Sequence, residues 1–339
     1  MNRALVLFSG SLASQLALRL AEAAGAFDLQ VVHFRSPFFA ACEQVRDHLQ
    51  RLAPGIPFRT HTLKREYLHI AADGTGLPFP CGACRRVLLR KAARAARRLH
   101  AGFVITGEVV GRGGMGAEEL MALDSGVGLS GRVLRPLSAQ LLPAPRWAPR
   151  QWGYGFAAGD EEELARLGRR LGVSEGVGAD RRCRLTDPGF VQRLSSLLAE
   201  GPPTVNALRL LEFRHFFHLR PDIKVVVATA REELESLQTL FLPTDVRLYL
   251  PVPNSPLALV RADWSRRSAA ERMRAVGWAA QLTLAVAGRQ QGETERVCFR
   301  FEWEEETKRL VATSPGLQDL GTLGECSLMS APAEVYSLG

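Results

Sequence analysis

Short apolar runs alternate with helical segments through the first part of the chain, and this alternation restricts the fold more than any other feature. Apolar runs lie at Arg3–Phe8, Leu29–Phe34 and Pro57–Leu63, and helical periodicity lies between them at Leu12–Ala24 and Phe39–Leu52. Strands that alternate with helices are typical of parallel sheets, because parallel strands need long crossover connections. The sequence therefore predicts an α/β domain with a parallel, Rossmann-like sheet.

The stretch Pro80–Gly111 joins reactive side chains to this sheet. Cys81 and Cys84 open it at C-x-x-C spacing, and the glycine and proline residues before them predict that both cysteines lie in a loop. A helix at Arg85–Leu99 and a fourth strand at Ala101–Ile105 follow. The strand ends in a glycine-bracketed turn that contains Thr106, Gly107, Glu108 and Gly111. Open α/β sheets bind ligands at the carboxyl ends of their strands, so this turn is a candidate binding site.

A serine-glycine turn follows the first strand and begins the first helix. It contains Ser9, Gly10, Ser11 and Ser14. A helix N-terminus presents free backbone N–H groups and the positive end of the helix dipole, so this turn is typical of an anion site. A helix that is merely capped by serine explains the same residues, and that alternative stays open. Both turns fall at the same edge of the expected sheet.

The helix at Arg85–Leu99 is strongly basic. Its apolar positions recur near the helical period and leave the cations on the outer face, with no aspartate or glutamate between them. The whole chain carries a net charge of +8, which favours an anionic partner, nucleic acid first. A solvated surface helix is the alternative for the same charge run. The residues from which we expect RNA contacts are Arg86, Arg90, Arg94 and Arg97.

The two turns, the C-x-x-C pair and the basic helix occur in the order found in PP-loop ATP pyrophosphatases. The run Pro80-Cys81-x-x-Cys84-Arg85-Arg86 followed by Thr106-Gly107-Glu108-x-x-Gly111 resembles in particular the tRNA thiouridine synthetases. The resemblance implies a PP-loop domain of the adenine nucleotide alpha hydrolase-like fold that binds ATP and Mg²⁺. Such enzymes activate a uridine with ATP and replace its oxygen with sulfur. The cofactor-binding residues that the resemblance implies are Ser9, Gly10, Ser11, Ser14, Phe34, Thr106, Gly107, Glu108 and Gly111.

Two positions depart from the S-G-G-x-D-S pattern of this family. Ser11 stands where the second glycine is expected and adds a Cβ where a phosphate should meet the backbone. Ala13 stands where aspartate is expected and removes a carboxylate suited to magnesium. These departures motivate an alternative function, a degenerate, non-adenylating paralogue. Such a protein would be an iron–sulfur RNA-binding subunit or would transfer sulfur without ATP.

Six cysteines occur in the chain, and their number and spacing favour reduced thiols over a disulfide framework. In cluster-dependent tRNA thiolases, a similar C-x-x-C pair and one distant cysteine hold a 4Fe-4S cluster. The resemblance thus implies Cys81, Cys84 and Cys183 as metal ligands and catalytic residues, with one iron left open for the sulfide that is transferred. A zinc site, a redox pair that forms a persulfide and structural thiols stay open as alternatives. Cys42 and Cys298 are expected in the core.

The second half of the chain has a different pattern. Gly201-Pro202-Pro203 is expected to separate a nucleotide and iron–sulfur domain at 1–200 from a smaller α+β domain at 204–339. A hairpin is expected from Arg296–Trp303 and Lys308–Thr313. The aromatic segment Phe213–Leu219, together with Arg220 and Lys224, is a candidate for stacking on single-stranded RNA. Packed or surface histidines at His215 and His218 are the alternative. This half also resembles, faintly, the RNA-binding module of ribosome quality-control factors.

The chain contains no apolar run long enough to span a membrane and no export signal at its start, so a cytoplasmic location and no membrane partner are expected. The expected partners are tRNA or another RNA and a sulfur donor. A homo-oligomer and a separate partner subunit both stay open.

Overall fold

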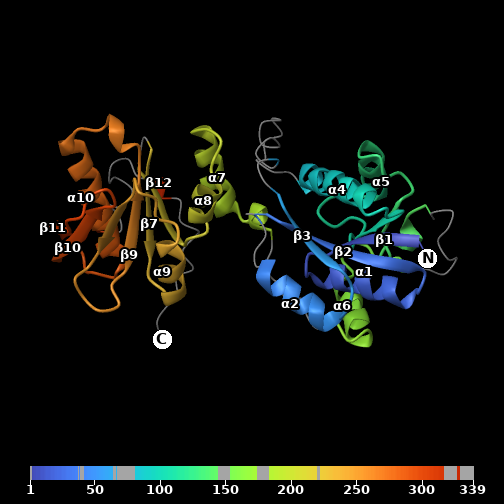
Figure 1. Cartoon of the computed structure of the whole chain (residues 1–339). Helices are drawn as coiled ribbons and strands as arrows, with labels where there is room; N and C mark the ends of the chain where they lie inside the picture. Colours follow the sequence, from blue (N-terminus) through green and yellow to red (C-terminus); the bar gives the residue numbers. More distant parts are fainter. Residues whose placement is uncertain are drawn as a thin grey trace. The chain divides into compact units, whose positions relative to one another are not determined.

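The computed structural model describes residues 2–36, 38, 42–63, 66, 81–143, 153–173, 183–219, 222–316 and 327–328. The chain divides into two compact units, Met1–Thr186 and Asp187–Gly339 (Figure 1). Within the described residues, no helix is both long and apolar enough to cross a membrane.

The first unit is built on a five-stranded parallel sheet with the strand order β3-β2-β1-β4-β5. Its strands are β1 (Asn2–Leu7), β2 (Phe27–Arg35), β3 (Phe58–Thr62), β4 (Phe103–Ile105) and β5 (Val133–Leu134). The strand order reverses at β1, which has β2 on one side and β4 on the other. Ligands of open α/β sheets bind at the carboxyl ends of the strands where such a reversal occurs. This sheet confirms the α/β fold expected from the sequence.

Helices cover both faces of this sheet (Figure 1). They are α1 (Leu12–Ala23), α2 (Cys42–Leu52), α4 (Cys81–Arg98), α5 (Ala117–Gly126) and α6 (Glu161–Arg170), with short 3₁₀ turns at Ala139–Leu141 and Arg184–Thr186. On one face, α1 and α2 pack through an apolar cluster that includes Leu18, Val31, Val45 and Leu49. The helices α4 and α5 lie on the opposite face. Coverage of both faces explains the nearly continuous apolar runs of β1 and β2.

Helix α4 begins at Cys81, so the expectation that both cysteines lie in a loop is wrong. Proline is tolerated just before a helix or in its first turn, so Pro80 does not prevent this start. Residues three apart in a helix lie on the same face, which makes Cys81 and Cys84 neighbours on α4. The Cys84 side chain is buried, whereas the side chains of Cys81 and Cys42 lie outside the described residues.

The second unit is a seven-stranded sheet with the order β11-β10-β8-β9-β7-β6-β12 and antiparallel pairing. Its strands are β6 (His215–Leu219), β7 (Ile223–Ala228), β8 (Val246–Tyr249), β9 (Leu257–Arg261), β10 (Thr294–Phe301), β11 (Lys308–Thr313) and β12 (Ser327–Leu328). Its helices are α7 (Pro188–Ala199), α8 (Val205–Leu210), α9 (Arg231–Gln238) and α10 (Ala269–Val286), with a 3₁₀ turn at Trp264–Arg266. Strands β10 and β11 form the expected hairpin, and the unit confirms the smaller α+β domain.

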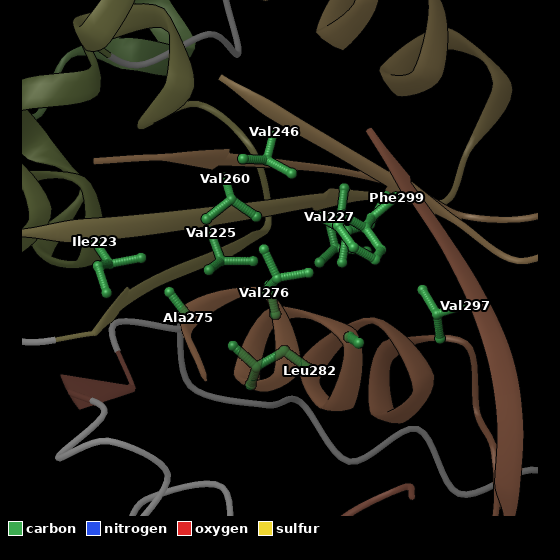
Figure 2. Packing of buried hydrophobic residues seen from close by; sticks show 14 of the residues in the cluster. Ile223, Val225, Val227, Val246, Val260, Ala275, Val276, Leu282, Val297 and Phe299 are labelled. Atoms are coloured by element: carbon green, nitrogen blue, oxygen red, sulfur yellow. The ribbon is translucent and has the colours of Figure 1, made fainter. Parts of the chain in front are cut away.

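The core of this second unit lies between its sheet and α10. Val225, Val227 and Val260 of the sheet pack toward Val276 and Leu282 of the helix (Figure 2). Burial of such branched side chains stabilises a fold by about 1.5–3 kcal/mol each. This core packs together strands that lie far apart in the sequence of the unit.

The aromatic side chains before and in β6 belong to the interior. Phe213, Phe216 and Phe217 are all buried. Their rings therefore do not present stacking surfaces, and the expectation that this segment stacks on single-stranded RNA is wrong for these residues. Cys298 is buried in β10, as expected.

Helix α7 belongs to the second unit. The guanidinium of Arg193 in α7 donates to the carbonyl oxygen of Leu211 at 3.1 Å, and Glu200 at the end of α7 pairs with Lys224 of β7. These contacts hold α7 against Leu211 and against β7 of the second unit. The boundary expected at Gly201-Pro202-Pro203 therefore lies inside the second unit.

Candidate functional site

A pocket of about 380 Å³ opens at the carboxyl edge of the parallel sheet. Its wall is formed by the ends of β1, β2 and β4, by the start of α1, by the N-terminal half of α4 and by Cys183. Its polar side chains include several expected from the sequence, namely Ser9, Ser11, Ser14, Thr106, Glu108 and Cys183. Phe34 and Gly107 also line the pocket, whereas Gly10 and Gly111 are not part of its described wall. The two turns expected at one edge of the sheet therefore share one pocket.

The two turns touch at Gly107. A Cβ on Gly107 would lie 2.5 Å from the carbonyl carbon and oxygen of Ala13 and 2.6 Å from the backbone nitrogen of Ser14. Such distances are far inside van der Waals contact, so a glycine is required for this close approach of two backbones. The contact fixes the Thr106–Glu108 turn against the first turn of α1.

Serine hydroxyls organise the turn before α1. Gly10 has a φ of 85°, a left-handed conformation that glycine adopts readily. Ser11 is the N-cap of α1, and its Oγ accepts a hydrogen bond from the backbone N–H of Ser14 at 3.4 Å. Ser9 Oγ shares hydrogen bonds with the Oγ atoms of Ser11 (3.0 Å) and Ser14 (3.3 Å). Every residue of α1 is described, and its first turn contains no acidic residue, so the positive end of the helix dipole is not offset there.

A buried polar pair supports this turn from inside the unit. Gln15 is fully buried, and its Nε2 donates to the carbonyl oxygen of Gly10 at 2.9 Å. His48 of α2 donates from Nε2 to Oε1 of Gln15 at 2.7 Å. Burial, together with the charge of Arg51, lowers the pKa of His48 and favours the neutral ring. Neither Gln15 nor His48 was predicted from the sequence, although a glutamine on the apolar face of a helix could have indicated a buried polar contact.

Glu108 is held by cations on two sides. Its Oε2 accepts hydrogen bonds from Nε of Arg135 at 2.8 Å and from Oγ1 of Thr106 at 3.1 Å, and its Oε1 lies 3.6 Å from Nε of Arg85. Arg135 is almost completely buried and also pairs with Asp124. Burial raises the pKa of Asp124, and the hydrogen bonds from Arg135 act against that rise. Sequence reasoning missed Arg135 and Asp124, because nothing in their spacing pairs them with the pocket.

The end of β2 places a histidine in the pocket wall beside Phe34. His33 is 4% exposed, and its Nδ1 donates to the carbonyl oxygen of Phe8 at 2.8 Å. Its Nε2 has no hydrogen-bond partner among the described residues. Burial lowers the pKa of His33, although the hydrogen bond to Phe8 opposes this effect, so Nε2 of the neutral ring carries a lone pair. The end of β2 thus holds a buried hydrogen-bond acceptor.

Cys183 lies in the pocket wall although it is remote in sequence from the other wall residues. Cys84 is buried in the first turn of α4, directly before Arg85, which also lines the pocket. One thiol, that of Cys183, therefore lies in the pocket wall, and thiols are the soft donors that suit an iron–sulfur cluster or zinc. Among the side chains that are described, no group of three His, Cys, Asp or Glu residues could hold a metal ion. A site built on Cys84 and Cys183 therefore requires Cys81, whose side chain lies outside the described residues.

The arginines expected to contact RNA form one stripe on α4. All four side chains are exposed: Arg86, Arg90, Arg94 and Arg97. Their spacing of three or four residues places them along one side of the helix. The stripe begins beside the pocket, because Arg85, the residue before Arg86, lines the pocket wall.

Comparisons with known proteins give distant similarity. No family model matches the sequence, and no curated protein matches it. One similar solved structure is a predicted subunit of tRNA methyltransferase from Methanocaldococcus jannaschii, with 13% identity and a TM-score of 0.35, covering 61% of this chain and 91% of that chain. Another is the U34-tRNA thiolase NcsA from Methanococcus maripaludis with its 4Fe-4S cluster, with 15% identity and a TM-score of 0.34, covering 62% of this chain and 72% of that chain. At TM-scores this low, neither match establishes the fold or the activity of this chain.

Proposed function

We propose that this protein is a tRNA sulfurtransferase that activates a uridine with ATP and replaces its oxygen with sulfur. The observation that supports this best is the position of Cys183, which shares one pocket with the serine turn before α1 and with the Thr106–Glu108 turn. An anion site and a thiol in the same pocket suit a reaction in which an activated oxygen is exchanged for sulfur.

The triphosphate is proposed to bind at the N-terminus of α1. Backbone N–H groups, the helix dipole and the hydroxyls of Ser9 and Ser11 favour negative charge there. Arg85 and Arg112 line the same pocket and add positive charge. The adenine would lie against Phe34 at the end of β2. Binding of ATP at this position brings its phosphates to the point where the two turns meet.

Cys81, Cys84 and Cys183 are proposed to hold a 4Fe-4S cluster beside this pocket. Three protein thiolates leave one iron of such a cluster open, and that position supplies the sulfide chemistry. This chain contributes two cysteines on one turn of α4 and a third from a distant segment. Zinc suits the same thiols, and metal analysis of the purified protein separates the two assignments.

RNA is proposed to bind over the arginine stripe of α4. The exposed guanidinium groups can contact phosphates without reading base sequence, so they would position tRNA and not select it. Such binding weakens as salt increases, because condensed counterions are released when phosphates are neutralised.

The test uses the whole chain purified without oxygen and treated with iron and sulfide. Unmodified tRNA, ATP, Mg²⁺ and a sulfide donor are added, and thiouridine is measured by mass spectrometry after digestion of the tRNA. We expect thiouridine that depends on ATP and disappears after exposure to air or a chelator. The variant Cys183→Ser should form none, whereas Cys298→Ser, a change in the core of the second unit, should retain the activity. Product formation that is indifferent to air and chelation contradicts the proposal.

A second candidate function is favoured by the first turn of α1. The Ser11 side chain caps the helix, and Ala13 supplies no carboxylate for magnesium. Among the described wall residues, the acidic one is Glu108, which is already bound by Arg135. The alternative is a non-adenylating protein that keeps the thiols and the RNA surface. Calorimetric titration with ATP and Mg²⁺ separates the two candidates, because iron-containing protein that binds RNA but no ATP supports the second.

A further inference from the structure

A smaller pocket of about 150 Å³ lies between β3 and the C-terminal half of α4. We call it the basic pocket. Its wall consists of His61, Lys91, Arg94, Ala95 and Arg98. Lys91, Arg94 and Arg98 follow one another at one-turn spacing on α4, so they present their charges on the same side of the helix. His61 comes from β3, one of the two edge strands of the described parallel sheet. One strand and one helix therefore build one cationic hollow.

The positive charge of the basic pocket is only partly neutralised. Lys91 pairs with Glu66 at 2.6 Å. Within the described residues, no acidic side chain pairs with Arg94 or Arg98. Burial lowers the pKa of His61, and the nearby charges of Lys91, Arg59 and Arg98 lower it further. Like charges one helical turn apart destabilise a helix, so this arrangement favours an anion between them.

The basic pocket is connected through one ring contact and one helix to the pocket of about 380 Å³ at the carboxyl edge of the parallel sheet, which we call the main pocket. The ring of His61 lies 6.0 Å from the ring of Phe34, which lines the main pocket. Leu88 and Leu89 of α4 line the main pocket, and Arg94 and Arg98 line the basic pocket. At 1.5 Å per residue, the two groups are separated by roughly 10 Å along the helix. A short stretch of nucleic acid backbone spans such a distance.

We propose that the basic pocket binds a phosphate group of the RNA backbone adjacent to the nucleotide that enters the main pocket. This inference rests on the proposed function and adds the register in which the RNA lies along α4. Guanidinium groups match the geometry of phosphate oxygens, and two of them converge here with a histidine. A terminal phosphate of a free nucleotide has the same chemistry, so the test must distinguish the two sources.

The test compares tRNA binding by the whole chain and by Arg94→Gln/Arg98→Gln, measured by fluorescence anisotropy over a series of salt concentrations. We expect binding to weaken about tenfold or more, as expected for loss of charged hydrogen bonds. The slope of log K against log salt should also become less steep by about 0.7 for each phosphate that the variant no longer neutralises. The matched control is Arg169→Gln/Arg170→Gln, which removes the same charge from exposed positions of α6 and should leave both quantities unchanged. His61→Asn provides an independent single change in the same pocket and should weaken binding in the same direction.

Each result has a distinct meaning. If the basic-pocket variants bind tRNA like the unmodified protein while Arg86→Gln/Arg90→Gln binds weakly, the phosphate site is overturned and RNA binding over α4 stands. If the unmodified protein itself does not bind tRNA, both the site and the proposed function fail. If the basic-pocket variants lose ATP affinity but keep tRNA affinity, the pocket holds a nucleotide phosphate and the RNA assignment is wrong. Equal midpoints of urea unfolding confirm that the variants compared are folded.

Discussion

Arg135 and Asp124 form a bidentate ion pair inside the first unit, with N–O distances of 2.7 and 2.8 Å. The same guanidinium donates from Nε to Glu108, which lines the main pocket. Asp124 lies on α5 and is not part of the described pocket wall. A buried pair outside the described pocket wall therefore sets the orientation of a carboxylate in that wall.

Replacing Arg135 with methionine should strongly destabilise the first unit. The change leaves Asp124 buried without its partner, and breaking a buried pair costs about 3–5 kcal/mol. Asp124→Asn should also be destabilising, and the double variant should lose less than the sum of the two because no unpaired carboxylate is left at position 124. Urea unfolding of the four proteins measures this coupling. Strictly additive losses would show that the two side chains do not act together.

The exposed Arg166 provides the control for this cycle. Its side chain pairs only with glutamates of its own helix among the described residues, and surface pairs contribute about 0–1 kcal/mol. Arg166→Met should therefore change the free energy of unfolding by less than about 1 kcal/mol.

Substituting alanine for Gly107 should separate the two turns of the pocket. The added Cβ meets backbone atoms of Ala13 and Ser14 and forces a shift, which costs about 1–3 kcal/mol. Nucleotide binding should weaken in parallel, since both turns line the pocket. Gly126→Ala is the matched control, because within the described residues no atom lies within 4 Å of its added Cβ, apart from its chain neighbours and the backbone of its own helix. Identical unfolding curves and identical ATP titrations for the two variants would refute this account of the two turns.

The stability of the first unit should fall in mild acid through His48. Burial lowers the pKa of this ring in the folded protein from the ordinary value of 6.5. Just below pH 6.5 the unfolded chain then binds more protons than the folded one, so stability rises with pH in that window and is lost as the pH falls through the folded pKa. His48→Gln keeps a donor for Gln15 and does not titrate.

The free energy of unfolding measured from about pH 7.5 to about pH 5 checks this prediction. The loss should be smaller in His48→Gln than in the unmodified protein. His33 is also shifted downward and remains in both proteins, so the difference between the two curves isolates His48. Parallel curves would mean that His48 does not contribute.

The parallel sheet was predictable because its signals are local. Strand and helix periods differ clearly at Arg3–Phe8, Leu12–Ala24 and Leu29–Phe34, and the strands and helix found there agree with them. Because parallel strands share a carboxyl edge, the turns after β1 and β4 were expected at one place, and the main pocket contains side chains from both.

Much of the support around the pocket was not predictable. Arg135, His48 and His61 act through partners that are remote in sequence, and neither composition nor periodicity reveals such pairs. Short elements were missed for a different reason, since the two residues of β5 and the six residues of α8 show too little of a repeat. The presence of Cys183 in the pocket wall also has no local signal, because only the fold brings its segment there.

The iron and acid-labile sulfide content of the whole chain purified without oxygen tests most directly whether Cys81, Cys84 and Cys183 hold one cluster. We predict about four iron atoms and four sulfides per chain, as a 4Fe-4S cluster requires. Both should be lost in Cys183→Ser and kept in Cys298→Ser. Zinc in place of iron, or the same iron content in Cys183→Ser as in the unmodified protein, would contradict the proposed reaction centre.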